Sequence, residues 1–530
     1  MRFLTATAAS MMLGLSTAAY NTWPHQSFKS SPHEPPSLKI TKTGPTAPGY
    51  LFFDQSWKAH QYSVFMMSEE NELVWQSPEG DVKDFRVQML DGKPVLTYWN
   101  GLGVPEPFGW GYGLVQILDE HYESIYNVTV TDDHYKALGT INSTSFYSWL
   151  DMHESTITAD NTMLVTGYNV TQADLSAVGG PKNGWIADSL FYEIDIKTNA
   201  ILYRWSAIDH VDQISLEDVQ QFYPIEDWGR NSSAPYGYFH INSVEKFRDG
   251  QYLISSRYYS SLFKIAKDGS VDWTLQGADG GDFQLAHGIH FRYQHDARIH
   301  REAHGHLLVS IFDNDNSDVT NGTHPTEGIY MDINELTREV RVVRQLEDPA
   351  DPIYATSQGS TQHLPNGHSV MGYGAIPKIK EYSANGSVVL TAQFGPDNVV
   401  ASYRGYKFPW VGAPNTVPDV VACVDRKGNQ TNVYMSWNGA TEHQLWKVEG
   451  GLTRDNLRGV GEVRKTGFET VAKVKGGIEW VQAEAVGMGI ENGVSRVVAV
   501  KKPKQHHSHF VTTVLSLLGS GLLQRNLFAP

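Results

Sequence analysis

Three histidines occupy the same place in a layout that recurs along the sequence. His240 and His295 each precede a polar or glycine-containing turn by about ten residues, and His153 does so in a copy that is one or two residues shorter. A short apolar stretch ending in Ser or Thr follows each turn. A histidine at one fixed place in several copies of a repeat is not typical of core packing, so we interpret these three as facing a common site. Histidine can bind a metal ion, transfer protons or attack an electrophile.

The neighbouring residues favour anion chemistry at this site. Asn242 lies two positions after His240, which on a strand is the same face. Arg257 ends the apolar stretch that comes next. Neutral or cationic donors together with a guanidinium suit a tetrahedral oxyanion, because guanidinium binds such groups through two parallel hydrogen bonds. The residues therefore predict a pocket that holds an anionic group beside a nucleophilic or basic histidine.

Metal and nucleotide chemistry fit less well. Zinc sites usually use ligands that are close in sequence, and no carboxylate ligand is indicated near the three histidines. We therefore expect a site without metal or cofactor, with a metal bound by the histidine-dense segment 287–306 as the alternative. The sequence contains no phosphate-binding GxxxxGK[ST] loop and no GxGxxG motif that opens a helix. A nucleotide donor is not expected.

The elements that must position these residues are short strands joined by tight turns. The layout recurs around Ser357 and, without a histidine, around Asp91-Gly92, and the copies that carry His153, His240, His295 and Ser357 lie roughly 55 to 87 residues apart. Such repeats are typical of radially arranged four-stranded blades, whose innermost strands bring equivalent positions to a central channel. We predict an all-β fold, a six-bladed β-propeller. A pair of β-sandwiches is the competing fold, but it would not repeat one polar position before each turn.

Composition and charge limit the function further. The 530 residues carry a formal net charge of -16, which argues against a nucleic-acid surface or an anionic membrane face. The single cysteine, Cys423, excludes an internal disulfide and a cysteine-based zinc site. Small-molecule chemistry is the class that remains.

The ends of the sequence indicate secretion. Residues 1–19 resemble a signal peptide, 20–48 a linker or N-terminal arm, 49–500 the propeller, and 501–530 a C-terminal tail. The apolar run 510–523 is shorter than the roughly 20 residues of a membrane span. A weak membrane contact there is the alternative to a disordered or loosely docked tail. Sequons for N-glycosylation occur at Asn127, Asn142, Asn169, Asn231, Asn321, Asn385 and Asn429.

Several separate motifs together resemble one known family. They are 96–101 (LTYWNG), 205–211 (WSAIDHV), 240–244 (HINSV), 294–298 (QHDAR), 312–314 (FDN), 357–360 (SQGS), 402–404 (SYR) and 436–441 (SWNGAT). In order and spacing they resemble the fungal branch of the arylsulfotransferases that do not use the nucleotide sulfate donor. The chain lacks the additional N-terminal β-sandwich of the bacterial members, and with one cysteine it cannot form their disulfide.

The resemblance implies a role for each candidate residue. It implies ping-pong transfer of a sulfuryl group from an aryl sulfate to a phenol through a sulfohistidine at His295. His240, Asn242 and Arg257 match the group that holds the sulfate oxygens, and His153 resembles the base for the acceptor phenol. Two alternatives stay open: another tailoring reaction on a phenolic secondary metabolite with the same histidines, and a propeller that only binds ligand.

Overall fold

The fold is built almost entirely from strands. The computed structural model describes residues 22–104, 109–131, 148–317, 322, 324–425, 428–490 and 492–502. Within these ranges the chain forms no α-helix, and its only helical turns are the 3₁₀ helices η2 (Ser176–Val178), η3 (Ala207–His210) and η4 (Asp218–Gln221). The prediction of an all-β fold is confirmed. No helix in these ranges has the length and apolar character that a membrane span requires.

Strands between residues 50 and 408 pair in successive antiparallel sets of four. The sets are β28 (Gly405–Phe408) with β2 (Tyr50–Asp54), β4 (Val64–Met67) and β5 (Leu73–Gln76); β6 (Asp81–Leu90), β7 (Lys93–Gly103), β8 (Gly111–Leu118) and β9 (Ser124–Val128); β10 (Leu150–Ile157), β11 (Thr162–Ala173), β12 (Gly184–Asp195) and β13 (Ile201–Ser206); β14 (Ile241–Lys246), β15 (Tyr252–Ser256), β16 (Ser261–Ile265) and β17 (Val271–Gln276); β19 (His295–Ala303), β20 (His306–Asp313), β21 (Glu327–Asn334) and β22 (Glu339–Leu346); and β23 (Ser360–His363), β24 (Ser369–Gly372), β25 (Lys378–Tyr382) and β26 (Val388–Gln393).

Shorter strands extend these sets. β1 (Lys39–Lys42) pairs with β26, and β18 (Gln284–Leu285) pairs in parallel with β22. β3 (Ser56–Trp57) and β27 (Val400–Ala401) form a two-stranded ladder, and β10 also pairs with β8 at Leu150 and Gly113.

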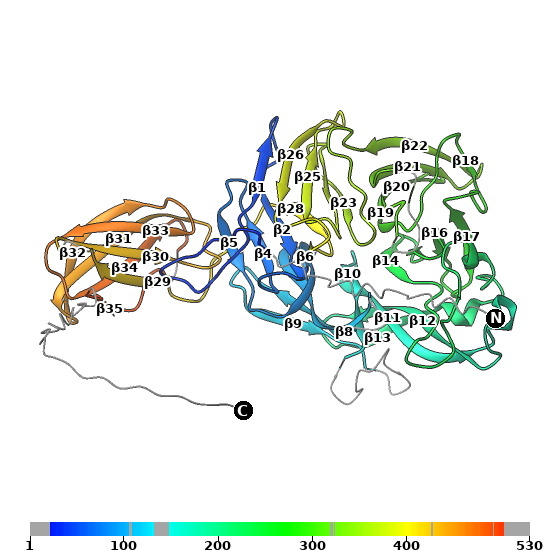
Figure 1. The fold of residues 1–530 in the computed structure, drawn as a ribbon, viewed down its shortest axis with the longest axis horizontal. Coiled ribbons are helices and arrows are strands. Elements are labelled where there is room, and N and C mark those ends of the chain that lie inside the picture. Colours follow the sequence, from blue (N-terminus) through cyan, green and yellow to red (C-terminus); the bar gives the residue numbers. More distant parts are fainter. Residues whose placement is uncertain are drawn as a thin grey trace, which may run out of the picture.

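The first strand of each set contacts the first strands of two other sets. The order of contact is β28, β6, β10, β14, β19 and β23, and β23 contacts β28 again. The strand sets accordingly lie around a common centre in Figure 1. β28 comes from the far end of this region but pairs with β2 from its start, through partners such as Tyr50 with Phe408. Strands from the two ends of the region thus lie side by side.

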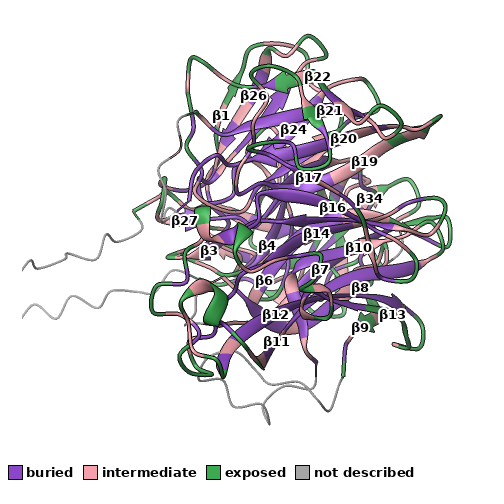
Figure 2. Cartoon of the chain, turned by 90° about the vertical axis from the view of Figure 1, so that its right-hand side faces the viewer, coloured by how far each residue is buried: buried purple, intermediate pink, exposed green. Residues whose placement is uncertain are grey.

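The apolar cores lie between neighbouring sets rather than at the centre. One cluster joins Phe191 and Trp205 to Ile254 and Phe263, which come from the sets of β10 and β14. Most strand residues are buried, and exposed residues gather on the connecting turns, as Figure 2 shows. Apolar side chains therefore pack neighbouring strand sets against each other. The inner strands, which lie away from these cores, can carry polar side chains.

The last strands form a separate pair of sheets. One sheet orders β29 (Asp419–Val424), β30 (Gln430–Ser436) and β33 (Glu469–Lys475); the other orders β32 (Asn456–Arg464), β31 (His443–Thr453), β34 (Trp480–Gly487) and β35 (Val498–Ala499). They enclose their own core around Trp437 and Trp446 and extend to one side in Figure 1. One propeller was expected over residues 49–500, but this range holds two sets of sheets with separate cores. No low-complexity linker separates them, so the sequence offered no clear point at which to divide the chain.

The expected linker at 20–48 is tied to the folded parts over its described residues. Strand β1 joins the set of β23, and the backbone N–H groups of Lys29 and Ser30 donate to Glu469 at 2.6 and 2.7 Å. Phe28 lies against Phe468, with ring centroids 4.6 Å apart. The segment therefore contacts both the ring of strand sets and the C-terminal sheets.

Several expectations fall outside the described residues. They are the signal peptide, the sequons at Asn142 and Asn321, and the apolar run 510–523. Of the other sequon asparagines, Asn169 is half-buried and the rest are exposed: Asn127, Asn231, Asn385 and Asn429.

A buried ion network joins the inner strands. Glu154 of β10 contacts Arg86 of β6 at 2.8 Å, Arg298 of β19 at 2.8 Å and Arg404, just before β28, at 3.3 Å. Arg404 also contacts Asp84 at 3.2 Å. Burial alone would raise the pKa of Glu154, but Arg298, Arg404 and Arg86 hold it well below its usual range. The carboxylate therefore stays ionised and links strands of different sets.

Removal of this carboxylate tests the network. We expect Glu154→Ala to lower the free energy of unfolding by about 3–5 kcal/mol, because it removes the carboxylate that three buried guanidinium groups share. Urea unfolding followed by tryptophan fluorescence measures the change. The matched control is Glu339→Ala, which removes a carboxylate of the exposed pair with Arg341 and should change the same free energy by less than about 1 kcal/mol. Equal losses in the two variants would contradict this role for Glu154.

Candidate functional site

Four of the five predicted catalytic residues line one cavity. His153, His240, Arg257 and His295 surround a space of about 270 Å³. His153 lies in β10, His295 begins β19, His240 directly precedes β14 and Arg257 directly follows β15. The site thus lies where inner strands of three neighbouring sets meet. Asn242 does not line this cavity.

Hydrogen bonds fix the protonation pattern of His295. Its Nδ1 lies 2.7 Å from Oδ1 of Asn314, whose Nδ2 donates to the carbonyls of Ala355 and Gln358 at 3.1 Å each. The amide orientation set by those carbonyls makes Oδ1 an acceptor, so His295 carries its proton on Nδ1. Its Nε2 accepts from the backbone N–H of Gln358 at 3.2 Å. The lone pair of this buried histidine is therefore on Nε2, the nitrogen that a nucleophile needs.

Electrostatics keep His295 neutral. Burial and the nearby Arg257 lower the pKa of His295 well below 6.5, against the opposing hydrogen bond to Asn314. The pKa of His240 is likewise lowered well below 6.5 by burial and by His153, Arg257 and His295. Two neutral imidazoles therefore lie beside one guanidinium at physiological pH.

His153 forms a dyad that the sequence did not reveal. Its Nδ1 hydrogen-bonds the buried carboxylate of Asp151, which also accepts from the backbone N–H of Gly111 at 2.9 Å and from Thr166 at 3.2 Å. The ring of His153 stands edge-on to that of His240, with centroids 4.6 Å apart. A carboxylate bonded to Nδ1 places the proton there and leaves Nε2 as a base. The sequence did contain one indication of this dyad, because Asp151 lies two positions before His153.

Arg257 is held by few partners. Its guanidinium donates to the carbonyl of Thr356 at 2.9 Å and lies over the ring of Tyr258, 4.9 Å from the centroid. Its Nε has no hydrogen-bond partner. Tyr258 stacks in turn on Tyr223, with centroids 3.9 Å apart and planes inclined by 7°. Stacking fixes the plane of the guanidinium while donors remain for a ligand.

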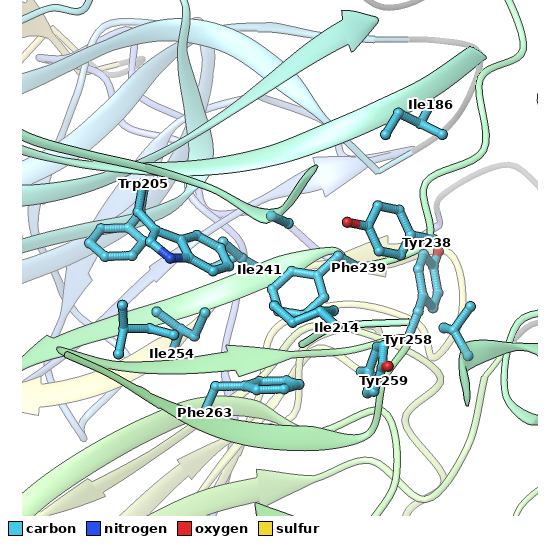
Figure 3. Packing of buried hydrophobic residues seen from close by; sticks show 14 of the residues in the cluster. Ile186, Trp205, Ile214, Tyr238, Phe239, Ile241, Ile254, Tyr258, Tyr259 and Phe263 are labelled. Atoms are coloured by element: carbon cyan, nitrogen blue, oxygen red, sulfur yellow. The ribbon is translucent and has the colours of Figure 1, made fainter. Parts of the chain in front are cut away.

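The aromatic layer around Tyr258 is shown in Figure 3, where Tyr238, Phe239, Tyr258 and Tyr259 lie close together over Ile214. These residues come from the segments that flank β14 and β15 and from the insertion after β13. The insertion therefore packs directly behind the cavity wall that carries Arg257.

Asn242 has a different position from the one predicted. It is fully buried, and its Nδ2 donates to the carbonyl of Gln294 at 2.6 Å. The pairing of β14 with β15 shifts register between Ile241 and Ser243, so the alternation of faces on which the prediction relied is broken at this point. Asn242 therefore contacts the backbone that leads into His295, and its side chain lies outside the cavity lining.

Other cavity residues were also missed. Lys83 lines the cavity and contacts Asp81 at 2.6 Å, and the aromatic wall includes Trp57, Trp110 and Tyr403. None of these residues occupies the position in the sequence repeat that His153, His240 and His295 share, so the repeat could not predict them. Across the described residues, no group of three or more His, Cys, Asp or Glu side chains has an arrangement that could hold a metal ion.

Comparison with known proteins decides the family. A family model described as Arylsulfotransferase (ASST) matches residues 86–395, more than half of the chain and the range that contains every residue of the cavity's histidine group. The chain belongs to the arylsulfotransferase family. A search of curated proteins finds no match.

Similarity to solved structures is remote. A Bacteroides caccae protein of unknown function is 11% identical, with a TM-score of 0.38, and the match covers 68% of this chain and 99% of that one. A Penicillium chrysogenum alpha-L-arabinanase complexed with arabinobiose is 11% identical with a TM-score of 0.33, covering 67% and 88%. A streptogramin B lyase is 9% identical with a TM-score of 0.31, covering 75% and 94%.

The proton on His295 Nδ1 can be tested without turnover. Selective ¹⁵N-histidine labelling, with the His295 signals assigned by their loss in His295→Ala, should show a protonated Nδ1 and an unprotonated Nε2 on this ring, unchanged down to pH 5. We expect Asn314→Leu to lose this pattern, because the acceptor that holds the Nδ1 proton is gone. Asn438→Leu removes an amide with hydrogen bonds to Gln76 elsewhere and should leave the pattern intact. A wild-type spectrum with the proton on Nε2 would disprove the assigned tautomer, and an unchanged spectrum in Asn314→Leu would disprove the role of Asn314 in setting it.

Proposed function

We propose that this member of the family transfers a sulfuryl group from an aryl sulfate to a phenol through a sulfohistidine at His295. The observation that carries the proposal is the Nε2 lone pair of a neutral, buried histidine beside Arg257. Membership of the arylsulfotransferase family supports an aryl substrate and transferase chemistry. A cavity of about 270 Å³ suits a single aromatic ring with one anionic substituent.

We further propose that residues 50–408 form a six-bladed β-propeller with this site at one mouth of its channel. The successive four-stranded sets and the ring of contacts among β28, β6, β10, β14, β19 and β23 support it. The pairing of β28 with β2 would close the ring, because it completes one blade with strands from both ends of the region.

In the proposed first half-reaction His295 Nε2 attacks the sulfur of the donor ester. The N–S bond forms as the bond from sulfur to the aryl oxygen breaks, and the leaving group departs as a phenolate. Arg257 and the cavity donors Lys83 and His240 would stabilise charge on the sulfuryl oxygens. The Nδ1 proton stays on the ring, and Asn314 accepts its hydrogen bond while the imidazole carries positive charge.

In the second half-reaction His153 would act as the base. It takes the proton of the acceptor phenol as the phenol oxygen attacks sulfur, and the N–S bond breaks to restore neutral His295. Asp151 stabilises the imidazolium that forms on His153. The aromatic wall of Trp57, Trp110 and Tyr258 would hold donor and acceptor rings in turn.

We also propose that the protein is secreted and glycosylated. The exposed sequon asparagines Asn127, Asn231, Asn385 and Asn429 support this proposal. Peptide mapping of the secreted protein before and after removal of N-linked glycans would identify the modified positions.

Trapping the intermediate tests the reaction. Incubation with p-nitrophenyl sulfate alone should release p-nitrophenolate and add one SO₃ group to the peptide that contains His295. His295→Ala should form no adduct and lose turnover to added phenol by at least about 10³-fold, because the attacking atom is removed. His300→Ala, a half-buried histidine outside this cavity, is the matched control and should form the adduct normally. Release and transfer without an adduct on His295 would refute the proposed intermediate.

The pH dependence of the first half-reaction tests the neutral nucleophile. A histidine with its pKa lowered keeps its lone pair as the pH falls, and protonation begins only below the lowered value. We therefore expect the rate of adduct formation to stay nearly constant from pH 8 to pH 5. A histidine of ordinary pKa, about 6.5, would retain only about 3% of its neutral form at pH 5. A rate that falls with an apparent pKa near 6.5 would contradict this prediction. Stopped-flow release of p-nitrophenol, followed at the wavelength where the phenol and the phenolate absorb equally, measures the rate at every pH.

A further inference from the structure

A second cavity lies where the strand ring meets the C-terminal sheets. It encloses about 240 Å³, and its wall includes Tyr50, Glu72, Trp437, His443, Lys465 and Phe468. Strand β5, which begins just after Glu72, lies next to the C-terminal sheets in Figure 1. None of the residues that line this cavity lines the cavity of His295.

His443 is the unusual group in this wall. Only 3% of its surface is exposed, yet neither Nδ1 nor Nε2 has a hydrogen-bond partner. Buried polar groups are nearly always hydrogen-bonded, so an orphaned imidazole beside a cavity indicates a missing partner. Burial, with the nearby Lys465, lowers the pKa of His443 to about 3. The ring is therefore neutral and offers one N–H donor and one acceptor nitrogen.

Lys465 has spare hydrogen-bonding capacity in the same wall. Its Nζ donates to the carbonyl of Ala440 at 3.2 Å, and within the described ranges it forms no ion pair. Burial lowers the pKa of Lys465 to about 8, against the carboxylates of Glu442 and Glu72. An ammonium has three N–H donors, so two remain for a ligand.

The charges around the cavity select a neutral ligand. The wall itself contains one carboxylate, Glu72, and one ammonium, Lys465, so the lining carries no net charge and favours neither an anion nor a cation. Lys465 requires an acceptor from the ligand and His443 can accept a hydrogen bond in return, and a hydroxyl group meets both needs. Trp437 and Phe468 supply aromatic surface.

We propose that this cavity is a second binding site, for a neutral single-ring phenol. The phenol hydroxyl accepts from Lys465 and donates to the unprotonated nitrogen of His443, and the ring packs against Trp437 and Phe468. The site is distinct from the proposed catalytic cavity and draws its residues from both parts of the chain. Bound phenol would therefore stabilise the contact between the strand ring and the C-terminal sheets.

Binding of 4-fluorophenol to the full-length protein, followed by ¹⁹F NMR without any sulfate donor, tests the proposal. Because the proposed catalytic cavity also takes a phenol, two bound signals are expected, and only one of them should weaken, at least tenfold in apparent affinity, in His443→Phe and in Lys465→Met. Arg257→Met, which alters the other cavity, should leave that signal unchanged. 4-Fluorobenzoate and 4-fluorobenzylamine should not compete for it. Folding of each variant is checked by its thermal melt.

A measurement on the unaltered protein keeps the test independent of the variants. Selective ¹⁵N-histidine labelling should show a shift of the unprotonated nitrogen of His443 when 4-fluorophenol is added. No shift at His443, an unaltered ¹⁹F signal in folded Lys465→Met, or tighter binding of the benzoate or the benzylamine would each overturn the proposal. The sulfuryl adduct on His295 is measured separately, so failure here leaves the catalytic proposal intact.

Discussion

The buried contact of Glu154 with Arg298 and Arg404 is the interaction on which the rest of the structure depends. Each of these charges has lost its hydration, and only pairing with the others offsets that cost. The inner strands must therefore keep the spacing that satisfies the network. His295 faces the catalytic cavity above it, whereas the next residue, Asp296, contacts Arg298 at 2.8 Å and lines a cavity of about 590 Å³ on the other side. The ion network thus forms the floor of the site.

Irregular strand pairing near the ion network directs the site histidines into the cavity. The register of β10, β14 and β19 with the next strand shifts after Leu150, Ile241 and His295, which are the places where the three site histidines lie. His240 and Asp296 also adopt positive φ angles of 54°. A bulge redirects side chains that a regular strand would point at its neighbours, and strained backbone persists only where its surroundings enforce it. The same local break in three sets explains why the histidines share one offset in the sequence.

The sequence predicts the features that depend on the repeat. It does not predict those that depend on local register shifts in strand pairing. The repeat was sufficient for an all-β fold and for the convergence of His153, His240 and His295. Asn242 was placed in the pocket by assuming regular alternation, which the register shift at Ile241 removes. Asn314 lay in a recognised motif, but only the amide's contacts with two carbonyls show that it sets a tautomer. No low-complexity linker marks the start of the C-terminal sheets, and strand pairing is what separates them from the ring.

Arg257 serves two purposes that would otherwise conflict. A pocket for an anion needs positive charge, and a histidine nucleophile must not become protonated. A second histidinium would supply the charge but remove the lone pair, whereas a guanidinium stays charged at any relevant pH and, after burial, is the main contributor to the lowered pKa of His295. In the proposed reaction, the same charge that would bind the sulfuryl oxygens therefore also keeps Nε2 unprotonated. Stacking on Tyr258 holds that charge in place.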